Sequence, residues 1–295
     1  MRKSLLIRCI LMFIGFPLLY TNCQWIDPKE KIPSYIQIDS LTYQGITPHG
    51  FSCAYVYVNY KLIGVFEIPA TIPVLEEGEC RITVRPGIDV NAYSYEREYY
   101  RLTGIFETRK TLVAAETQTI NPTFTTIDDA ELVWNEDFDN SAITLIASDS
   151  LTPQIQIERE SRPGNSGYVG KIRITPTDTL KDFFDYSMYD SVEVYFQSTP
   201  GFYEVSFKSN IAFEMRFKAF NQTTGMRADR TLMWVYPSPD TWKRIYINFS
   251  TIVSDNDAGT YYKPYFRVRR MEEFRNIDTL KVNLDDIRII YLKRN

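Results

Sequence analysis

The sequence predicts an all-β protein in which a small β-sandwich is followed by a larger two-sheet sandwich. Aromatic residues make up 15% of the 295 residues, and many Thr, Ile and Val accompany them, a composition that favours strands. Short runs of alternating apolar and polar residues recur between turn signals, and no long amphipathic helix interrupts them. A chain of this length suits two domains.

Residues 1–22 are expected to be a lipoprotein signal peptide. A basic start precedes a mostly apolar run at 5–20, which is too short to cross a bilayer comfortably. The stretch LYTNC at 19–23 resembles a lipobox, with a bulky Tyr20 and with Asn22 where a small residue is usual. The resemblance implies cleavage before Cys23, a diacylglycerol on its thiol and an acyl chain such as palmitate on its amine. The alternative is a secreted or uncleaved-anchor protein in which Cys23 occurs by chance.

Several acyl chains at Cys23 would attach the protein stably to a membrane. Residues 23–34 mix Pro with charged residues and are expected to form a tether. The formal net charge of the whole chain is −4, which argues against nucleic acid as a partner because clustered Lys and Arg supply that affinity. These features predict an outer-membrane lipoprotein and leave open which face of the membrane it occupies.

The first sandwich is expected at residues 35–126. The runs AYVYVNYKLIGVFEIP and ATIPVLEEGECRITVRPGI alternate in polarity, with turns at Asn59–Gly64 and at Glu77-Gly78. A further alternating pair at 99–125 belongs to the same sandwich. Cys53 and Cys80 lie in neighbouring candidate strands, so they either form a disulfide or remain two small buried thiols. The cysteines have no C-x-x-C spacing and so predict no metal site.

This part of the chain resembles a PEGA-type repeat, a small β-sandwich module of envelope proteins. The resemblance lies in VYVNYKLIG followed by IPATIPVLEEGECRITVRPGI. Tyr60 departs from the pattern because glycine normally makes that turn, and the connection at 66–70 is enlarged. Such modules act mostly as spacers or contact surfaces, which is the role that the resemblance implies.

The second sandwich is expected at residues 131–295. Turn signals such as STPG, NQTTG and SPDT separate strands whose apolar residues share one face. A brief helical turn is expected at 178–186. The alternating sets are Val192, Val194 and Phe196; Val205 and Phe207; Phe213, Met215 and Phe217; and Ile245, Ile247 and Phe249.

The order of these pieces resembles the galactose-binding-like jelly roll of many carbohydrate-binding modules. Its landmarks are an opening EDF strand, a central DTWKRIYINFS strand and a terminal LDDIRI strand. The resemblance implies a jelly-roll β-sandwich with Trp242 in the core. The two-part whole is similar to surface or outer-membrane lipoproteins of those Gram-negative bacteria that carry large repertoires of glycan-handling envelope proteins.

Catalytic patterns are missing from the sequence. The only histidine, His49, lies in the loop TPHG without a nucleophile motif, and neither a zinc set nor a phosphate-binding glycine loop is present. We therefore expect no enzyme activity. The alternative is a glycoside-acting enzyme that uses paired carboxylates.

The jelly-roll resemblance also implies a structural Ca²⁺ between the first and last strands. Glu136 or Asp137, with Asp285 or Asp286, are the candidate ligands because a hard cation prefers oxygen donors. The alternative is that these are exposed acids, one of them capping a turn.

Aromatic residues in three loops are the candidate ligand-binding residues, because rings stack on the apolar faces of sugars. Arg267, Arg269 and Arg270 follow one group and offer hydrogen bonds to a sugar or to an acidic partner. The alternative for each ring is packing in the core. The candidates are Trp234, Tyr236, Tyr261, Tyr262, Tyr265, Phe202 and Tyr203.

Together these features predict a non-catalytic, membrane-anchored binding or assembly component of the cell envelope. Within that class the sequence leaves two possibilities open. The second sandwich either captures a glycan or contacts the other subunits of an outer-membrane protein complex.

Overall fold

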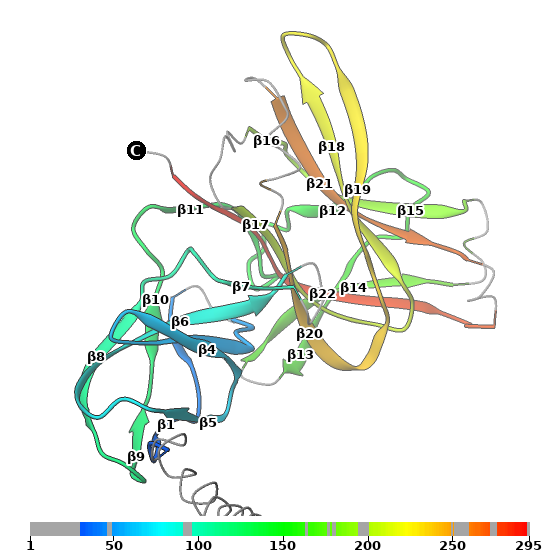
Figure 1. Cartoon of the computed structure of the whole chain (residues 1–295). Helices are drawn as coiled ribbons and strands as arrows, with labels where there is room; N and C mark the ends of the chain where they lie inside the picture. The colour runs from blue at the N-terminus through cyan, green and yellow to red at the C-terminus, as the bar shows by residue number, and fades with distance from the viewer. Residues whose placement is uncertain are drawn as a thin grey trace, which may run out of the picture.

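The computed structural model describes residues 30–45, 49–90, 96–162, 165–175, 178, 181–193, 201–248, 250, 260–271 and 276–293. Every element within these ranges is a β-strand, and the strands form two sandwiches in line (Figure 1). The predicted all-β fold is confirmed. The helical turn expected at 178–186 is wrong, because Phe183–Met188 form a strand.

The expected signal peptide and the lipidation site Cys23 lie outside the described residues. Within them, no helix has the length and apolar character needed to cross a bilayer.

The first sandwich is built from strands β1 to β10. One sheet has the order β4-β3-β6-β7, with β8 also pairing with β6, and it packs on a sheet of order β5-β1-β9. Alternating apolar residues of both sheets, such as Ile36, Val56 and Ile82, form the core between them. The PEGA-type character of this sandwich stays a prediction. The strands are β1 (Ser34–Ile38), β2 (Thr42–Gln44), β3 (Cys53–Val58), β4 (Lys61–Glu67), β5 (Ala70–Val74), β6 (Gly78–Asp89), β7 (Arg97–Tyr99), β8 (Phe106–Leu112), β9 (Thr117–Ile120) and β10 (Thr123–Thr125).

The hairpin between β3 and β4 turns at Asn59 and Tyr60. Both residues have positive φ, 48° and 69°, as the tight turn that suits the strand twist requires. Glycine is the usual residue at the second position, so the chain forms this turn with a bulky side chain held in a left-handed conformation. The Tyr60 ring lies 4.6 Å from the guanidinium carbon of Arg81.

Of the two alternatives for the cysteines of this sandwich, the structure shows two buried thiols and no disulfide between them. Both thiols are free and buried. Cys53 pairs with Gly87 at one end of the β3–β6 ladder, whereas Val58 pairs with Ile82, so Cys80 lies beyond the opposite end of β3. A separation of several residues along a strand corresponds to roughly 20 Å, far outside the reach of a disulfide.

The second sandwich consists of two six-stranded sheets. One has the order β13-β14-β22-β17-β20 with β11 also pairing with β22, and the other has the order β12-β15-β21-β18-β19 with β16 also pairing with β21. The main core lies between these sheets and includes Tyr203, Phe213 and Phe266. The strands are β11 (Ala130–Glu136), β12 (Leu145–Ala147), β13 (Gln156–Arg162), β14 (Asn165–Ile174), β15 (Phe183–Met188), β16 (Val192–Glu193), β17 (Gly201–Ser209), β18 (Phe213–Asn221), β19 (Arg227–Val235), β20 (Ser238–Asn248), β21 (Thr260–Arg269) and β22 (Leu280–Leu292).

A small apolar cluster joins the two sandwiches. Ile88, Tyr100 and Leu102 of the first pack against Phe202 and Tyr246 of the second. The backbone N–H of residue 50 donates a hydrogen bond of 2.7 Å to the Tyr246 hydroxyl, across the junction. The first sandwich therefore covers part of one outer face of the second.

Charged side chains are buried beside this cluster. Arg244 and Glu204 form an ion pair, and their side chains are only 6% and 4% exposed. The Tyr100 hydroxyl donates to the same carboxylate from the other sandwich. Arg244 also donates to the Ser206 hydroxyl at 2.9 Å. Because each unpaired charge would be costly here, the network specifies how the sandwiches fit together.

Candidate functional site

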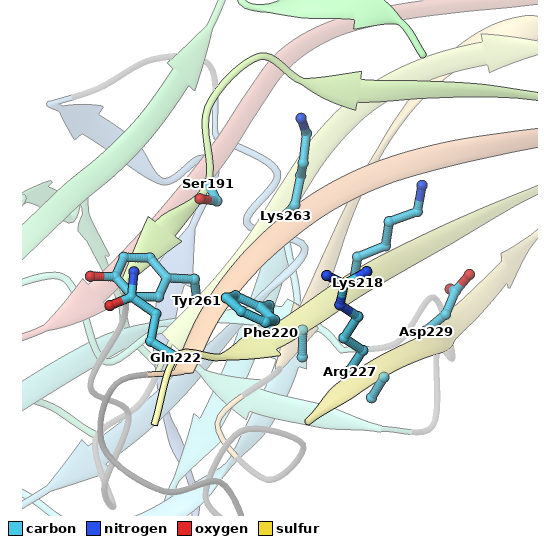
Figure 2. A pocket seen from close by; sticks show the side chains of 10 residues that line it. Ser191, Lys218, Phe220, Gln222, Arg227, Asp229, Tyr261 and Lys263 are labelled. Atoms are coloured by element: carbon cyan, nitrogen blue, oxygen red, sulfur yellow. The ribbon is translucent and has the colours of Figure 1, made fainter. Parts of the chain in front are cut away.

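A groove of about 620 Å³ lies on the outer face of the sheet that contains β18, β19 and β21. Its walls come from these three strands and from the chain near β16, and Figure 2 shows its side chains from close by. In Figure 1 this region lies at the end of the molecule opposite to β1, β5 and β9. The lining residues are Ser191, Lys218, Ala219, Phe220, Gln222, Arg227, Ala228, Asp229, Tyr261 and Lys263.

Strand alternation places the groove residues on this face. On β18, Phe213, Met215 and Phe217 point into the core, so Lys218 and Phe220 follow on the outer side. Cross-strand pairing then brings the matching outer residues together. Lys218 lies opposite Asp229 on β19 and Lys263 on β21, whereas Phe220 lies opposite Arg227 and Tyr261.

Three cations line the groove. None of Lys218, Arg227 and Lys263 has a carboxylate within ion-pairing distance among the described residues. The Lys218 ammonium lies 4.8 Å from the centre of the Tyr265 ring, and the Arg227 guanidinium carbon lies 5.4 Å from the centre of the Phe220 ring. Lys263 donates to a backbone carbonyl at 3.1 Å. Cation–π contacts hold two of these charges in place without neutralising them.

The carboxylate in the groove wall is already engaged. Asp229 accepts hydrogen bonds from the Tyr265 hydroxyl at 2.6 Å and from Arg216 at 3.0 Å. Burial raises the pKa of Asp229, but these hydrogen bonds outweigh burial and the pKa lies below its ordinary value. Asp229 therefore stays ionised and paired.

A second acid, Glu214, shares Arg216 with Asp229. Glu214 is buried and forms ion pairs with Arg216 and Arg269. Burial raises its pKa, but hydrogen bonds from Arg269, Arg216 and Thr231 bring the pKa below its ordinary value. Asp185 likewise binds Arg267 through both carboxylate oxygens, at 2.7 and 2.8 Å. These ion pairs hold the charged side chains of this sheet face in place around the groove.

Rings and an amide lie beside the cations. Phe220 is 39% exposed, and Tyr261 is partly buried. Figure 2 shows Gln222, Tyr261, Phe220 and Arg227 among the side chains that line the groove. The groove thus offers apolar ring surface, an amide and positive charge within one depression.

The structure separates the aromatic residues predicted as ligand contacts into three groups. Tyr261 lines the groove. Trp234 and Tyr236 are exposed, but Trp234 pairs with Glu214 and so lies at the far end of the β18–β19 ladder from the groove.

The other four predicted aromatic contacts are wrong. Tyr262 and Tyr203 belong to the core between the sheets, and Phe202 packs at the junction of the sandwiches. Tyr265 lies on the outer face, but its side chain is buried among the long side chains of Arg216, Lys218 and Arg267. None of these four rings offers a surface on which a ligand could stack.

The arginines after this segment are used internally. Arg267 and Arg269 hold Asp185 and Glu214, and Arg270 donates to the carbonyl of Thr175 at 2.5 Å. Trp242 was expected in the core, but it is half-buried and donates to Glu160 at 3.1 Å.

The structural calcium stays a prediction, and the four carboxylates proposed as its ligands make contacts within the chain. Among the described residues no three acidic, histidine or cysteine side chains lie close enough to hold a metal ion. Glu136 accepts four hydrogen bonds, three from the loop that follows β11 and one from the first residue of β12, and two of them come from Thr144 at 2.5 and 2.7 Å. Asp286 pairs with Arg288 at 3.3 Å, and its backbone N–H donates to Asp285 at 2.7 Å. In the structure these carboxylates accept hydrogen bonds from the adjoining loop or pair with a residue of the same strand.

Asp137 completes this set by closing a turn. Its carboxylate accepts from the backbone N–H of Asp139 at 3.2 Å and from Asn140 at 3.3 Å. His49, in turn, stacks on Phe51 with ring centres 4.5 Å apart. Burial, and then the charge of Arg244, lowers the pKa of His49.

Sequence reasoning missed most of the groove. Lys218, Phe220, Gln222, Arg227 and Lys263 carry no motif and lie on three different strands. The signal that could have found them is the alternation itself. The outer positions of β18 and β21 combine long cations with rings, including Lys218, Phe220, Tyr261 and Lys263.

No protein-family profile matches the sequence, and no curated protein is significantly similar to it. The structure is similar to a carbohydrate-binding module of the β-sandwich superfamily, with 11% identity and a TM-score of 0.41, over 89% of this chain and 99% of that chain.

Two further similarities are confined to about half of this chain. A xylan-binding domain of carbohydrate-binding module family 22 has 13% identity and a TM-score of 0.36, over 56% of this chain and 97% of that chain. A family 30 module of a cellulosomal cellulase of Clostridium thermocellum has 15% identity and a TM-score of 0.35, over 54% of this chain and 92% of that chain.

Proposed function

We propose that the chain is a non-catalytic glycan-binding lipoprotein of the outer membrane, and that the groove on β18, β19 and β21 is its binding site. The observation that supports this most is the combination of Tyr261, Phe220 and Gln222 in one open depression. Rings offer a surface to the C–H face of a sugar, and amide and cationic groups bond to its hydroxyls. A sheet face holds such groups rigidly, so little ordering is needed on binding.

The chemistry of the groove favours binding over hydrolysis. Glycoside cleavage needs two carboxylates facing each other across the bound sugar. Of the described residues that line the groove, Asp229 is the one carboxylate, and it is tied to Arg216 and Tyr265. We therefore do not favour the alternative of an enzyme with paired acids.

Glycan binding is tested by titration calorimetry of the folded chain with a panel of oligosaccharides. Tyr261→Ala and Phe220→Ala should each weaken binding at least several-fold. Tyr236→Ala is the matched control, because Tyr236 is an exposed ring that does not line the groove. Equal loss in the control, or binding unaffected by the two groove variants, would place the site elsewhere.

Membrane attachment is tested separately. We expect the wild-type chain in the outer-membrane fraction with the mass of an acylated N-terminus, and Cys23→Ser in the soluble fraction. An unmodified N-terminus on the wild-type chain would contradict the proposed anchor.

A second candidate function is that of a subunit in an outer-membrane protein complex. It is favoured by β4, which pairs only with β3 among the described strands and exposes Leu62 and Val65 beside the Tyr60 turn. An exposed apolar edge strand is a surface that proteins use for strand addition. A mild-detergent pull-down that yields a stoichiometric complex, lost on Val65→Lys, would support this role.

A further inference from the structure

We infer that the groove takes acidic saccharides, with their carboxylate or sulfate groups placed against Lys218, Arg227 and Lys263. The inference rests on the proposed glycan-binding function and adds the chemical class of the ligand. It starts from the charges on the outer face of the sheet.

Four strands of this sheet, β15, β18, β19 and β21, carry more cations than acids at their outer positions. Among the described residues they present six cations and three acids there. Each acid is paired with an arginine of the same face, because Asp185 holds Arg267, Glu214 holds Arg216 and Arg269, and Asp229 also holds Arg216. The surplus cations are Lys218, Arg227 and Lys263, and all three line the groove.

This surplus contrasts with the rest of the molecule. The whole chain has a formal net charge of −4, which by itself would repel an anionic ligand. A local excess of positive charge in the groove attracts such a ligand despite that net charge. Lys218 and Arg227 are also held against rings, at 4.8 and 5.4 Å from the ring centres. Two of the three cations are therefore positioned before any ligand arrives, which reduces the cost of ordering them.

The remaining lining distinguishes a saccharide from a bare anion. Tyr261 and Phe220 add ring surface that an inorganic ion cannot use, and Gln222 can both donate and accept hydrogen bonds. The groove is also open rather than closed around a small ion, and its lining comes mainly from three strands. A chain of sugar rings that carries acidic groups uses all of these features at once.

The test compares four probes by titration calorimetry on the folded chain. Agaro-oligosaccharides are neutral, carrageenan oligosaccharides carry sulfate groups, and oligogalacturonides carry carboxylates. Polyglutamate supplies carboxylates without any sugar. Each is measured at about 0.05 M and about 0.5 M NaCl, between which the Debye length falls from roughly 14 Å to roughly 4 Å.

We expect at least one acidic saccharide to bind more tightly than the neutral one, and to weaken about tenfold at the higher salt. Lys218→Gln with Arg227→Gln and Lys263→Gln should weaken it by about tenfold to a hundredfold, given the typical strength of exposed charge pairs. Lys281→Gln is the control, because Lys281 is exposed on β22 of the other sheet. Circular dichroism verifies that each variant is folded.

The outcomes are distinguishable. Preference for sulfate or for carboxylate on a sugar supports the inference and identifies the anionic group. Binding of the neutral saccharide with equal affinity and no salt dependence overturns the inference but leaves glycan binding standing. Equal binding of polyglutamate overturns the assignment to saccharides, and binding of no saccharide overturns the inference together with the proposed function.

Discussion

Replacing Arg244 with Met should destabilise the protein by about 3–5 kcal/mol, the usual effect of leaving one partner of a buried ion pair alone. The structure shows why the full effect applies. Arg244 and Glu204 are 6% and 4% exposed, and without Arg244 the carboxylate keeps the Tyr100 hydroxyl as its donor from the first sandwich. For a chain of this size the change corresponds to a fall in melting temperature of roughly 10 °C.

The assay is urea unfolding followed by tryptophan fluorescence, combined in a double-mutant cycle with Glu204→Gln. Removing both charges leaves no buried ion without a partner, so the double variant should recover most of the loss from Arg244→Met. Tyr100→Phe tests the other side of the junction and should cost about 1.5–3 kcal/mol, because a hydrogen bond to a charged acceptor is lost.

The reasoning fails if Arg244→Met costs less than about 1 kcal/mol, the value for an exposed pair. It fails equally if the two single losses simply add in the double variant, because the charges would then not be coupled. In either case the sandwiches would not be held by this network.

Three further predictions concern separate features. Tyr60→Gly should be more stable than Tyr60→Ala by about 1 kcal/mol, because both lose the ring but only alanine keeps a Cβ at positive φ; equal urea midpoints would contradict this. Cys53 and Cys80 should both react with an alkylating reagent in denaturant without a reductant, and little in the folded state; mass spectrometry that finds them linked would show the free thiols to be wrong. Because the pKa of Glu214 is lower in the folded state, stability should be lost as the pH falls below the ordinary value of 4.5. Glu214→Gln should flatten that dependence in urea titrations between about pH 6 and pH 3, and an unchanged pH slope would refute it.

The alternation of side chains was enough to predict the fold class. The strands β17, β18 and β20 lie where apolar residues recur at every second position, with Phe213, Met215 and Phe217 as one such set. Two-residue periodicity says which residues share a face, and in a sandwich one face is always the core.

Alternation alone could not decide which rings remain exposed. In the segment around β21, Tyr261 and Tyr265 share the outer face, yet Tyr265 is covered by cations from β18 while Tyr261 lines the groove. Phe202 lies on an outer face that the first sandwich covers, which depends on how two domains meet. Such facts involve residues far apart in sequence, so a local pattern carries no information about them.

The sequence could not decide between a disulfide and two buried thiols for a related reason. Neighbouring strands can be recognised from the sequence, but their register cannot, and the register separates Cys53 from Cys80 along the ladder. The calcium prediction, which depended on acids at the first and last strands, stays a prediction. Those strands do pair, yet Glu136 and Asp286 are each occupied by contacts within the chain.

The apolar cluster between the two sandwiches has a consequence when several copies of the protein lie side by side. Because Tyr100, Phe202 and Tyr246 close the joint, the β18–β19 end is held at a fixed stand-off from β1, where the chain enters the first sandwich (Figure 1). Under the lipid anchor proposed above, neighbouring copies would all carry their grooves at the same distance from β1. A long polymer could then bridge several grooves, and weak single contacts would add up to avidity through high effective concentration.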